Sequence, residues 1–232
     1  MIQRTLIALI LLVSSPSASV HAEGEHKLMP SGIVFLHRHN QKTNAAHRPF
    51  CAGVLLDEKR LLTAGHCVSG TLVKSGDQSV TVQCRDEPGS LFLHEISGIN
   101  VHNRYDIAIV VFKNASNCVP KNHTLQISSQ SAGALYSLHV TARERFEFEI
   151  LESSKEVTYV QDHHVCLDEG MSGYPVFLDE KTLSDTRNRT LFALLISGTT
   201  DCPSTQILLH VEQMSSWIST HKSPSTSIGE RF

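Results

Sequence analysis

Short runs of apolar and β-branched residues recur along the chain, and turn residues separate them. Runs of this length and composition predict β-strands. The predicted strands are Gly32–Leu36, Phe50–Leu56, Arg60–Ala64, Val80–Gln83, Ile107–Phe112, Tyr136–Ala142, Glu147–Leu151, Val157–Gln161, Pro175–Leu178, Leu191–Ser197 and Ile207–Val211. Because few segments have a helical period, the pattern predicts an all-β fold, either a barrel or a sandwich.

Two segments break the strand pattern. Residues 212–221 place Met214, Trp217 and Ile218 on one face of a helix, which predicts a short amphipathic helix that packs against the rest of the protein. The stretch Lys113–His123 is polar, rich in Asn and contains Pro. It is predicted to be a linker between two β-structured halves.

The two ends of the chain differ from the rest. Arg4 is followed by the apolar run Leu6–Val13 and by small residues up to Ala22, which is the pattern of a secretory signal peptide over residues 1–22. A buried N-terminal core segment is the alternative. The apolar run is too short to cross about 30 Å of hydrocarbon, so no membrane partner is expected. Residues 222–232 are rich in Ser and Thr and are predicted to be a flexible tail.

The composition excludes several classes of protein. The 232 residues are 41% hydrophobic and 19% charged, which excludes a collagen, a disordered acidic tail and a coiled coil. The formal net charge of −3 gives no basic surface, so nucleic acid is not an expected partner. The length allows one large domain or two small ones.

Cysteine and histidine could form disulfides or bind a metal ion, and the sequence bears on both possibilities. An exported chain with 6 Cys most economically forms three disulfides, and fifteen pairings are possible. No Cys-x2-Cys pair is present, which argues against a zinc site. A metal-dependent hydrolase is one function that so many histidines could serve. The 14 His include no His-x-x-x-His motif, however, so this function is not favoured and no metal or cofactor is expected.

Three residues in separate segments have side chains that suit nucleophilic catalysis. His66 follows a predicted strand and precedes Cys67, Asp106 opens the apolar strand that begins at Ile107, and Ser172 stands in a glycine-rich turn. Each has a plain structural interpretation when taken alone: a structural histidine, a carboxylate at a strand end and an ordinary loop serine. An isolated buried carboxylate is costly, however, so Asp106 needs a partner if its strand is buried.

Taken together, these segments closely resemble the chymotrypsin/trypsin family of secreted serine proteases. The order is His66, Asp106, Ser172. The matching motifs are Thr-Ala-Gly-His-Cys (Thr-Ala-Ala-His-Cys in the family), Asp-Ile-Ala-Ile, and Gly-Met-Ser-Gly-Tyr-Pro (Gly-Asp-Ser-Gly-Gly-Pro in the family). The resemblance extends through Leu191–Ile218 and covers residues 32–220.

The resemblance implies an all-β fold of two six-stranded antiparallel β-barrels with the active site between them and a short C-terminal helix. On that basis the N-terminal barrel spans about residues 30–115 and the C-terminal barrel about residues 125–211. The helix follows at residues 212–221, within a protease domain of residues 23–221.

The resemblance also implies the role of each candidate residue. His66 would be the general base and acid, Asp106 would orient it, and Ser172 would be the nucleophile that forms an acyl-enzyme. The backbone N–H groups of Gly170 and Ser172 would form the oxyanion hole. The substrate-binding residues would be Ser197, Gly198 and His164.

The family pattern further implies how the cysteines pair. Cys51–Cys67 would fix the histidine loop, and Cys166–Cys202 would join the walls of the specificity pocket. With those two pairings given, Cys84 and Cys118 remain as the third. The partners to expect are protein or peptide substrates and protein inhibitors of proteases, with the chain acting as a monomer outside the cell or, in a bacterium, in the periplasm.

The sequence departs from the family next to the nucleophile. The family has an Asp there that binds the ammonium of a newly cut Ile-Val N-terminus, whereas this chain has Met171, which cannot accept an ammonium. Ile33-Val34 occurs, but Gly32 precedes it and no basic cleavage site does. We expect that the protein needs no such cleavage and that apolar packing of Met171 supports the loop.

Two further departures affect specificity. Tyr174 replaces a family Gly, and five residues separate Cys166 from Ser172 where trypsin-like members have three. The pocket floor therefore cannot be mapped residue by residue, and no preference for Arg or Lys is predicted. The leading hypothesis is an active serine endopeptidase, and the alternative is a catalytically inactive, protease-like binding module.

Overall fold

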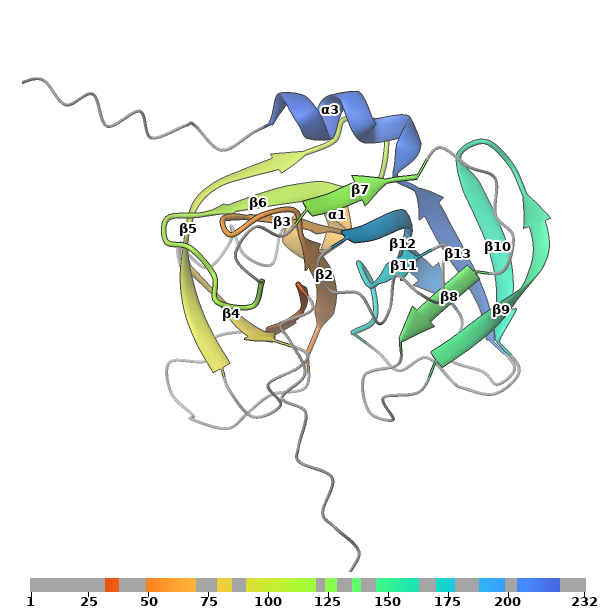
Figure 1. Cartoon of the computed structure of the whole chain (residues 1–232), viewed down its shortest axis with the longest axis horizontal. Coiled ribbons are helices and arrows are strands. Elements are labelled where there is room, and N and C mark those ends of the chain that lie inside the picture. Colours follow the sequence, from red (N-terminus) through yellow and green to blue (C-terminus); the bar gives the residue numbers. More distant parts are fainter. Residues whose placement is uncertain are drawn as a thin grey trace, which may run out of the picture.

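The computed structural model describes residues 32–37, 49–69, 79–84, 91–119, 124–128, 135–138, 145–162, 170–177, 188–198 and 204–221. Two β-sheets lie side by side, and a short helix lies across them near the end of the chain (Figure 1). The predictions for the signal peptide, the C-terminal tail, His164 and the Cys166–Cys202 pairing fall outside the described residues. No helix in the described part of the chain is long and apolar enough to span a membrane.

The first sheet is a closed six-stranded barrel with the strand order β1-β2-β3-β6-β5-β4. Its strands are β1 (Ile33–His37), β2 (Cys51–Leu55), β3 (Arg60–Thr63), β4 (Ser79–Cys84), β5 (Leu91–Val101) and β6 (Ala108–Phe112). Every pairing in it is antiparallel. The interior is apolar, because β1, β2, β3 and β6 have nearly all of their residues buried.

The second sheet has seven strands in the order β11-β8-β9-β10-β13-β12-β7, and a further pairing of β11 with β12 curls it back on itself. The strands are β7 (Thr124–Ile127), β8 (Leu135–Leu138), β9 (Arg145–Ser153), β10 (Val157–Asp162), β11 (Pro175–Phe177), β12 (Asn188–Gly198) and β13 (Ser204–His210). The all-β architecture of two curled sheets is thus confirmed. It differs from the expected all-antiparallel six strands because β7 is added in parallel along β12.

Two strands were not predicted from the sequence, β5 and β7. In β5, Phe92, His94 and Ile96 face inward while Leu91 and Leu93 are exposed. The apolar residues are therefore split between both faces, and the alternation that identifies a strand is lost. Strand β7 is only four residues long and directly follows the predicted linker, whose polar composition masked it.

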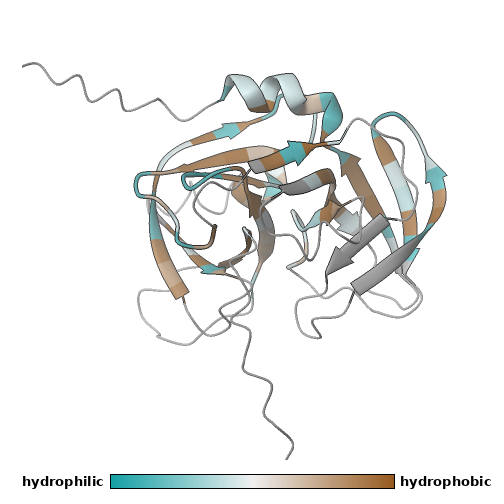
Figure 2. Cartoon of the chain, in the orientation of Figure 1, coloured by the Kyte–Doolittle hydropathy of each residue, from teal (hydrophilic) through white to brown (hydrophobic). Residues whose placement is uncertain are grey.

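The two sheets share one apolar core. Figure 2 shows apolar residues concentrated along the strands and hydrophilic residues at several turns. One cluster of buried residues includes Phe35 and Ile109 of the first sheet together with Tyr174 and Leu208 of the second. The rings of Phe35 and Tyr174 stack across this contact with their centroids 6.2 Å apart. The turn that holds Ser172 is therefore built directly onto the packed boundary between the sheets.

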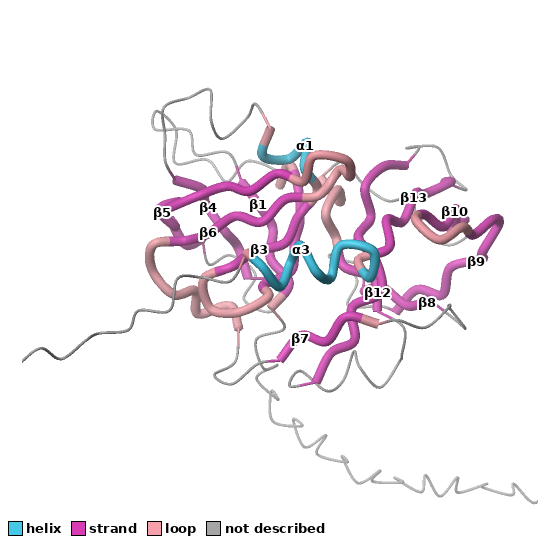
Figure 3. Tube along the Cα trace, turned by 90° about the horizontal axis from the view of Figure 1, so that it is seen from above, coloured by secondary structure: helices cyan, strands magenta, loops and turns pink. Residues whose placement is uncertain are grey.

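The C-terminal helix lies over the same boundary. A 3₁₀ turn, η1 (Glu212–Met214), leads into α3 (Ser215–Thr220), and Figure 3 shows α3 passing above the region where the two sheets meet. Met214 and Ile218 are buried in the shared core. On the first sheet, Nη1 of Arg60 donates to the carbonyl oxygen of His221 at 3.1 Å. The predicted amphipathic helix is present and packs on both sheets.

Candidate functional site

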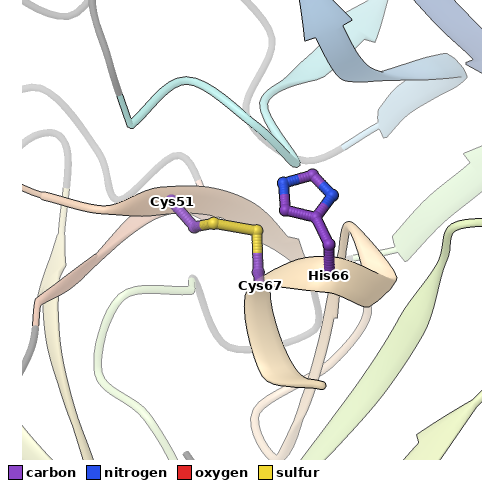
Figure 4. Close-up of side chains that lie close together, drawn as sticks. All are labelled: Cys51, His66 and Cys67. Atoms are coloured by element: carbon purple, nitrogen blue, oxygen red, sulfur yellow. A yellow bond between two sulfur atoms is a disulfide. The ribbon is translucent and has the colours of Figure 1, made fainter. Parts of the chain in front are cut away.

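His66 is held by a helix of one turn that follows β3. This helix, α1 (Gly65–Val68), begins directly after Ala64, and the Cys51–Cys67 disulfide ties it to β2 over a separation of 16 residues. Figure 4 shows the imidazole standing beside the disulfide. Closing a loop of this size contributes about 3 kcal/mol to stability in the chain-entropy model, so the backbone that presents His66 is fixed.

Cys51, His66 and Cys67 lie close enough together to suggest a metal site, but their chemistry does not suit one. Among the described residues, ligand atoms of Cys51, His66 and Cys67 lie within 4.8 Å of one another. Zinc binds cysteine as thiolate, and both sulfurs here are joined in the disulfide. The cluster does not fit a metal ion.

Asp106 binds His66 through both carboxylate oxygens. Nδ1 of His66 donates to Oδ2 of Asp106 at 2.7 Å, and the backbone N–H of His66 donates to Oδ1 at 2.7 Å. A carboxylate oxygen can only accept, so Nδ1 carries the proton and Nε2 of the neutral ring is an acceptor. The side chains are 48% and 37% exposed. The carboxylate is thus paired but only partly buried, since it stands at the outer end of β6.

These contacts change the pKa of both groups. The hydrogen bond to Asp106 raises the pKa of His66, and this effect exceeds the opposing effect of partial burial. For Asp106, burial raises the pKa, but the hydrogen bonds from the His66 side chain and backbone outweigh it and leave the pKa below its ordinary value. The pair is therefore arranged to stabilise an imidazolium opposite a carboxylate.

Ser172 lies in a turn bounded by two glycines with positive φ angles. Gly170 has φ of 97° and Gly173 has φ of 86°, a backbone region that glycine enters without steric cost. The N–H of Tyr174 donates to the carbonyl of Met171 at 2.9 Å, and the N–H of Gly173 donates to the carbonyl of Leu195 at 2.6 Å. These bonds fix the turn, which leads directly into β11, against β12 of the second sheet.

The first sheet holds this turn from the other side. The N–H of Ala52 donates to the carbonyl oxygen of Ser172 at 2.7 Å, and Sγ of Cys67 lies 3.7 Å from that oxygen. A Cβ on Gly173 would collide with the carbonyl oxygen of Ala52 and lie 2.5 Å from Oγ1 of Thr63. The backbone of Ser172 therefore touches the residue that follows His66 in sequence.

Some of the expected interactions are present and others are not. Within the described part of the chain, the Ser172 hydroxyl makes no hydrogen bond, either to Nε2 of His66 or to another group. The N–H groups of Gly170 and Ser172 likewise have no acceptor among the described residues. Of the expected substrate-binding residues, Ser197 is exposed at the end of β12, Gly198 follows it, and both pair with β13.

Met171 and Ile33, the two residues at which the sequence departs from the family's activation pattern, are both buried. Met171 is 7% exposed and belongs to the core that both sheets share. Ile33 is 1% exposed and pairs with Val54 as the first residue of β1, while the N–H of Gly32 donates to the carbonyl of Cys118 at 2.9 Å. Ile33-Val34 is thus part of the barrel wall and not a segment free to insert elsewhere.

The described cysteines form two disulfides. Cys51–Cys67 has been described above, and Cys84–Cys118 joins the end of β4 to the segment that leads to the second sheet, over a separation of 34 residues. These are two of the three pairings that the resemblance implied. His102, four residues before Asp106, was not among the predicted site residues, although a histidine so close to a candidate acid in a short turn was a visible signal.

Comparison with known proteins agrees with this arrangement of sheets, helix and motifs. No curated protein sequence matches the chain with significance. The sequence model of the trypsin family matches residues 31–218, a range that includes both sheets and the start of α3, and the chain therefore belongs to the trypsin family.

Proposed function

We propose that this protein is a secreted serine endopeptidase that hydrolyses peptide bonds through Ser172, His66 and Asp106. The observation that carries the proposal is the 2.7 Å bond from Nδ1 of His66 to Asp106. It leaves Nε2 as the proton acceptor, next to a turn that both sheets hold in place. Membership of the trypsin family supports protein or peptide substrates.

The proposed reaction starts at the Ser172 hydroxyl. Its oxygen attacks the carbonyl carbon of the scissile bond while its proton passes to Nε2 of His66, and Asp106 stabilises the imidazolium that results. The imidazolium then gives that proton to the leaving amine as the C–N bond breaks. A water molecule repeats the sequence on the acyl-enzyme and releases the acid. In the apo protein such hydrogen bonds are commonly long or unformed, and substrate binding tightens them.

The oxyanion would be held by the turn itself. The N–H groups of Gly170 and Ser172 have no acceptor among the described residues, so they remain available to a developing negative charge. A pair of such donors contributes several kcal/mol to transition-state stabilisation, about 3 kcal/mol for each donor. The end of β12 at Ser197 and Gly198, where Ser197 is exposed, is the proposed binding strand for an extended peptide, and His164 is proposed to contact a substrate side chain.

We also propose that the site assembles without a cut before Ile33. Such a cut would free an N-terminus that β1 holds within the barrel, and Met171 offers no carboxylate to receive it. Burial of Met171 in the shared core supports the turn instead, and removing a buried Met side chain costs about 2–5 kcal/mol.

A fluorophosphonate probe tests the catalytic proposal, because it reacts with an activated serine. Mature protein (residues 23–232) should be labelled, and peptide mass analysis should locate the adduct at Ser172. His66→Ala should abolish labelling while the far-UV circular dichroism stays unchanged. A folded wild-type protein that is never labelled would favour the alternative function, a protease-like binding module. The observation that favours this alternative is that the Ser172 hydroxyl makes no hydrogen bond to His66 in the described part of the chain.

The same probe tests assembly without cleavage. Mature protein purified with its N-terminus intact, as checked by mass spectrometry, should react at full rate. The idea would be wrong if reaction appeared only after proteolysis before Ile33.

Two disulfides in the described residues and the family membership support an extracellular location. Action as a monomer, and inhibition by protein inhibitors of proteases, are part of the same proposal.

A further inference from the structure

The position of Asp106 depends on the tight turn that joins β5 to β6. The N–H of His102 donates to the carbonyl of Ile107 at 2.9 Å, and the N–H of Ile107 donates to the carbonyl of Tyr105 at 2.8 Å. Ile107 is fully buried. Asp106 thus stands between two residues whose backbones are both fixed by this turn.

The side chain of His102 closes the turn from inside. Its Nδ1 accepts from the N–H of Arg104 at 3.1 Å and from the N–H of Tyr105 at 3.2 Å. A nitrogen that accepts two hydrogen bonds carries no proton, so the ring is neutral and its proton is on Nε2. If Nδ1 were protonated, an N–H would face two N–H donors and both bonds would be lost.

Aromatic contacts hold the ring in that orientation. The His102 ring lies 5.0 Å from the ring of Tyr105 on one side and 5.0 Å from Trp217 of α3 on the other, edge to face. The Trp217 ring in turn lies 4.8 Å from that of His221. The turn that carries Asp106 is therefore clamped against the C-terminal helix.

The charged groups around the ring act against its protonation. Partial burial lowers the pKa of His102 first, and the nearby Arg104 and His221 lower it further. Arg104 is paired with Glu156 of the β9–β10 turn at 2.7 Å, and Glu156 also accepts from the Tyr105 hydroxyl at 2.9 Å.

Three more charged side chains, Arg60, Asp57 and Asp106, belong to this turn or to the elements that pack around it. Arg60 reaches the carbonyl of His221 and pairs with Asp57 at 2.6 Å. Asp106 itself faces His66. The anions near the ring are thus already paired with other partners, and none is bonded to His102.

We propose that His102 is a positioning residue for Asp106, and that protonation of its ring opens the turn and weakens the bond between Asp106 and His66. The effect on the His66–Asp106 bond stands on its own geometry. The effect on catalysis rests on the proposed protease function.

Two substitutions separate the acceptor from the ring. His102→Asn keeps an oxygen that can accept the N–H two residues later, as in an Asx turn, and it does not titrate. His102→Phe keeps the ring against Trp217 but removes the acceptor. His94→Phe is the matched control, because His94 is a buried histidine of lowered pKa that stacks on Phe112 and makes no hydrogen bond to the turn.

The first readout is the NMR titration of His66, which needs no activity. In His102→Phe the pKa of His66 should fall toward 6.5, while His102→Asn and His94→Phe should leave it at the raised wild-type value. An unchanged His66 pKa in folded His102→Phe would overturn the proposal. If that variant does not fold, the second readout decides alone.

The second readout is the acid limb of the rate of Ser172 labelling. In wild type, log rate should fall by about one unit per pH unit below the pKa of His66, and by about two units per pH unit once His102 also takes a proton. His102→Asn should keep the slope near one throughout, and His102→Phe should react about 10- to 100-fold more slowly at pH 8. A wild-type slope that stays at one would overturn the proposal. Complete absence of labelling would refute the protease function, and the His66 titration would still test His102.

Discussion

At the scale of single residues, the carboxylate of Asp106 is held by hydrogen bonds to both of its oxygens. It binds the imidazole of His66 and the backbone N–H of the same residue. Because both oxygens bind one partner, the orientation of the ring and its tautomer are set together. Replacing one oxygen should therefore disturb two properties at once.

Asp106→Asn tests this arrangement. An amide that presents N–H to Nδ1 favours the wrong tautomer and removes the negative charge that raises the pKa of His66. We expect the pKa of His66 to fall toward 6.5 by NMR and the rate of Ser172 labelling to fall by about 10⁴-fold. Retention of more than a tenth of the wild-type rate would contradict the role given to Asp106.

Gly173→Ala tests the support of the serine turn. The added methyl group would sit at a positive φ and collide with the carbonyl of Ala52, so we expect a loss of at least about 2 kcal/mol in the free energy of urea unfolding. Labelling of Ser172 should be lost as well. Gly98→Ala is the matched control, because a Cβ on Gly98 meets no atom within 4 Å, and it should change stability by less than about 1 kcal/mol.

The sequence identified the candidate residues but not their contacts. The motifs around His66 and Ser172 are contiguous, so local pattern was enough to find them. Two partners that fix the turn are Ala52, whose N–H donates to the carbonyl of Ser172, and Leu195, whose carbonyl accepts from the N–H of Gly173. Both are distant from Ser172 in sequence and are ordinary core residues by composition. Only the fold brings them to the turn.

At the scale of secondary-structure elements, α3 depends on the shared core more than on its own helical propensity. It has six residues, and isolated helices of that length are not stable in water. Met214 and Ile218 anchor it, while the carbonyls at its end receive Nη1 of Arg60. The helix is thus held by tertiary contacts from both of its sides.

Met214→Ala should weaken this anchor. Met214 is 1% exposed, so the substitution leaves a cavity at the junction of η1 and α3, and we expect a loss of about 2–5 kcal/mol in the free energy of unfolding. Ser216→Ala, on the exposed side of α3, is the control and should have little effect. Urea denaturation followed by the fluorescence of Trp217, the one tryptophan of the chain, measures both variants. Equal midpoints for the two would show that the helix is not anchored through Met214.

Element prediction succeeded where burial follows a simple rule. Strands β1, β2, β3 and β6 are buried almost throughout, and short apolar runs reveal such strands. It failed at β5, where an inward-facing histidine and outward-facing leucines obscure the alternation. The parallel addition of β7 to β12 was equally hidden, because the pairing partners lie about sixty residues apart and nothing local specifies the neighbour of a strand.

At the scale of the whole molecule, buried and half-buried histidines make stability depend on pH. Burial is the largest cause that lowers the pKa of His94, His102 and His210. Among the described residues, Nε2 of His94 is buried without a hydrogen-bond partner, so a charge there would have no compensation from them. His66 behaves oppositely, because its pKa is raised.

The sign of the pH dependence follows from these directions. A histidine whose folded pKa lies below 6.5 contributes stability that is complete above about pH 6.5 and is lost as the pH falls through the folded value. His66 adds stability below pH 6.5 that is lost as the pH rises through its folded pKa. His94, His102 and His210 lose stability as the pH falls, and His66 alone gains it. We therefore expect a lower urea midpoint at pH 5.5 than at pH 7.5. His94→Phe should reduce that difference, and an unchanged difference would exclude His94 as a contributor.

The hydrogen bond from Ala52 to Ser172 means that both halves of the polypeptide hold the Ser172 turn. Under the proposed function, neither half would be active on its own, and fragments produced separately would become active only on reassociation. Mild heating or denaturant that merely loosens their contact should silence the protein while its circular dichroism still looks native. Loss of activity would then show that the two sheets have separated under conditions in which neither of them has unfolded.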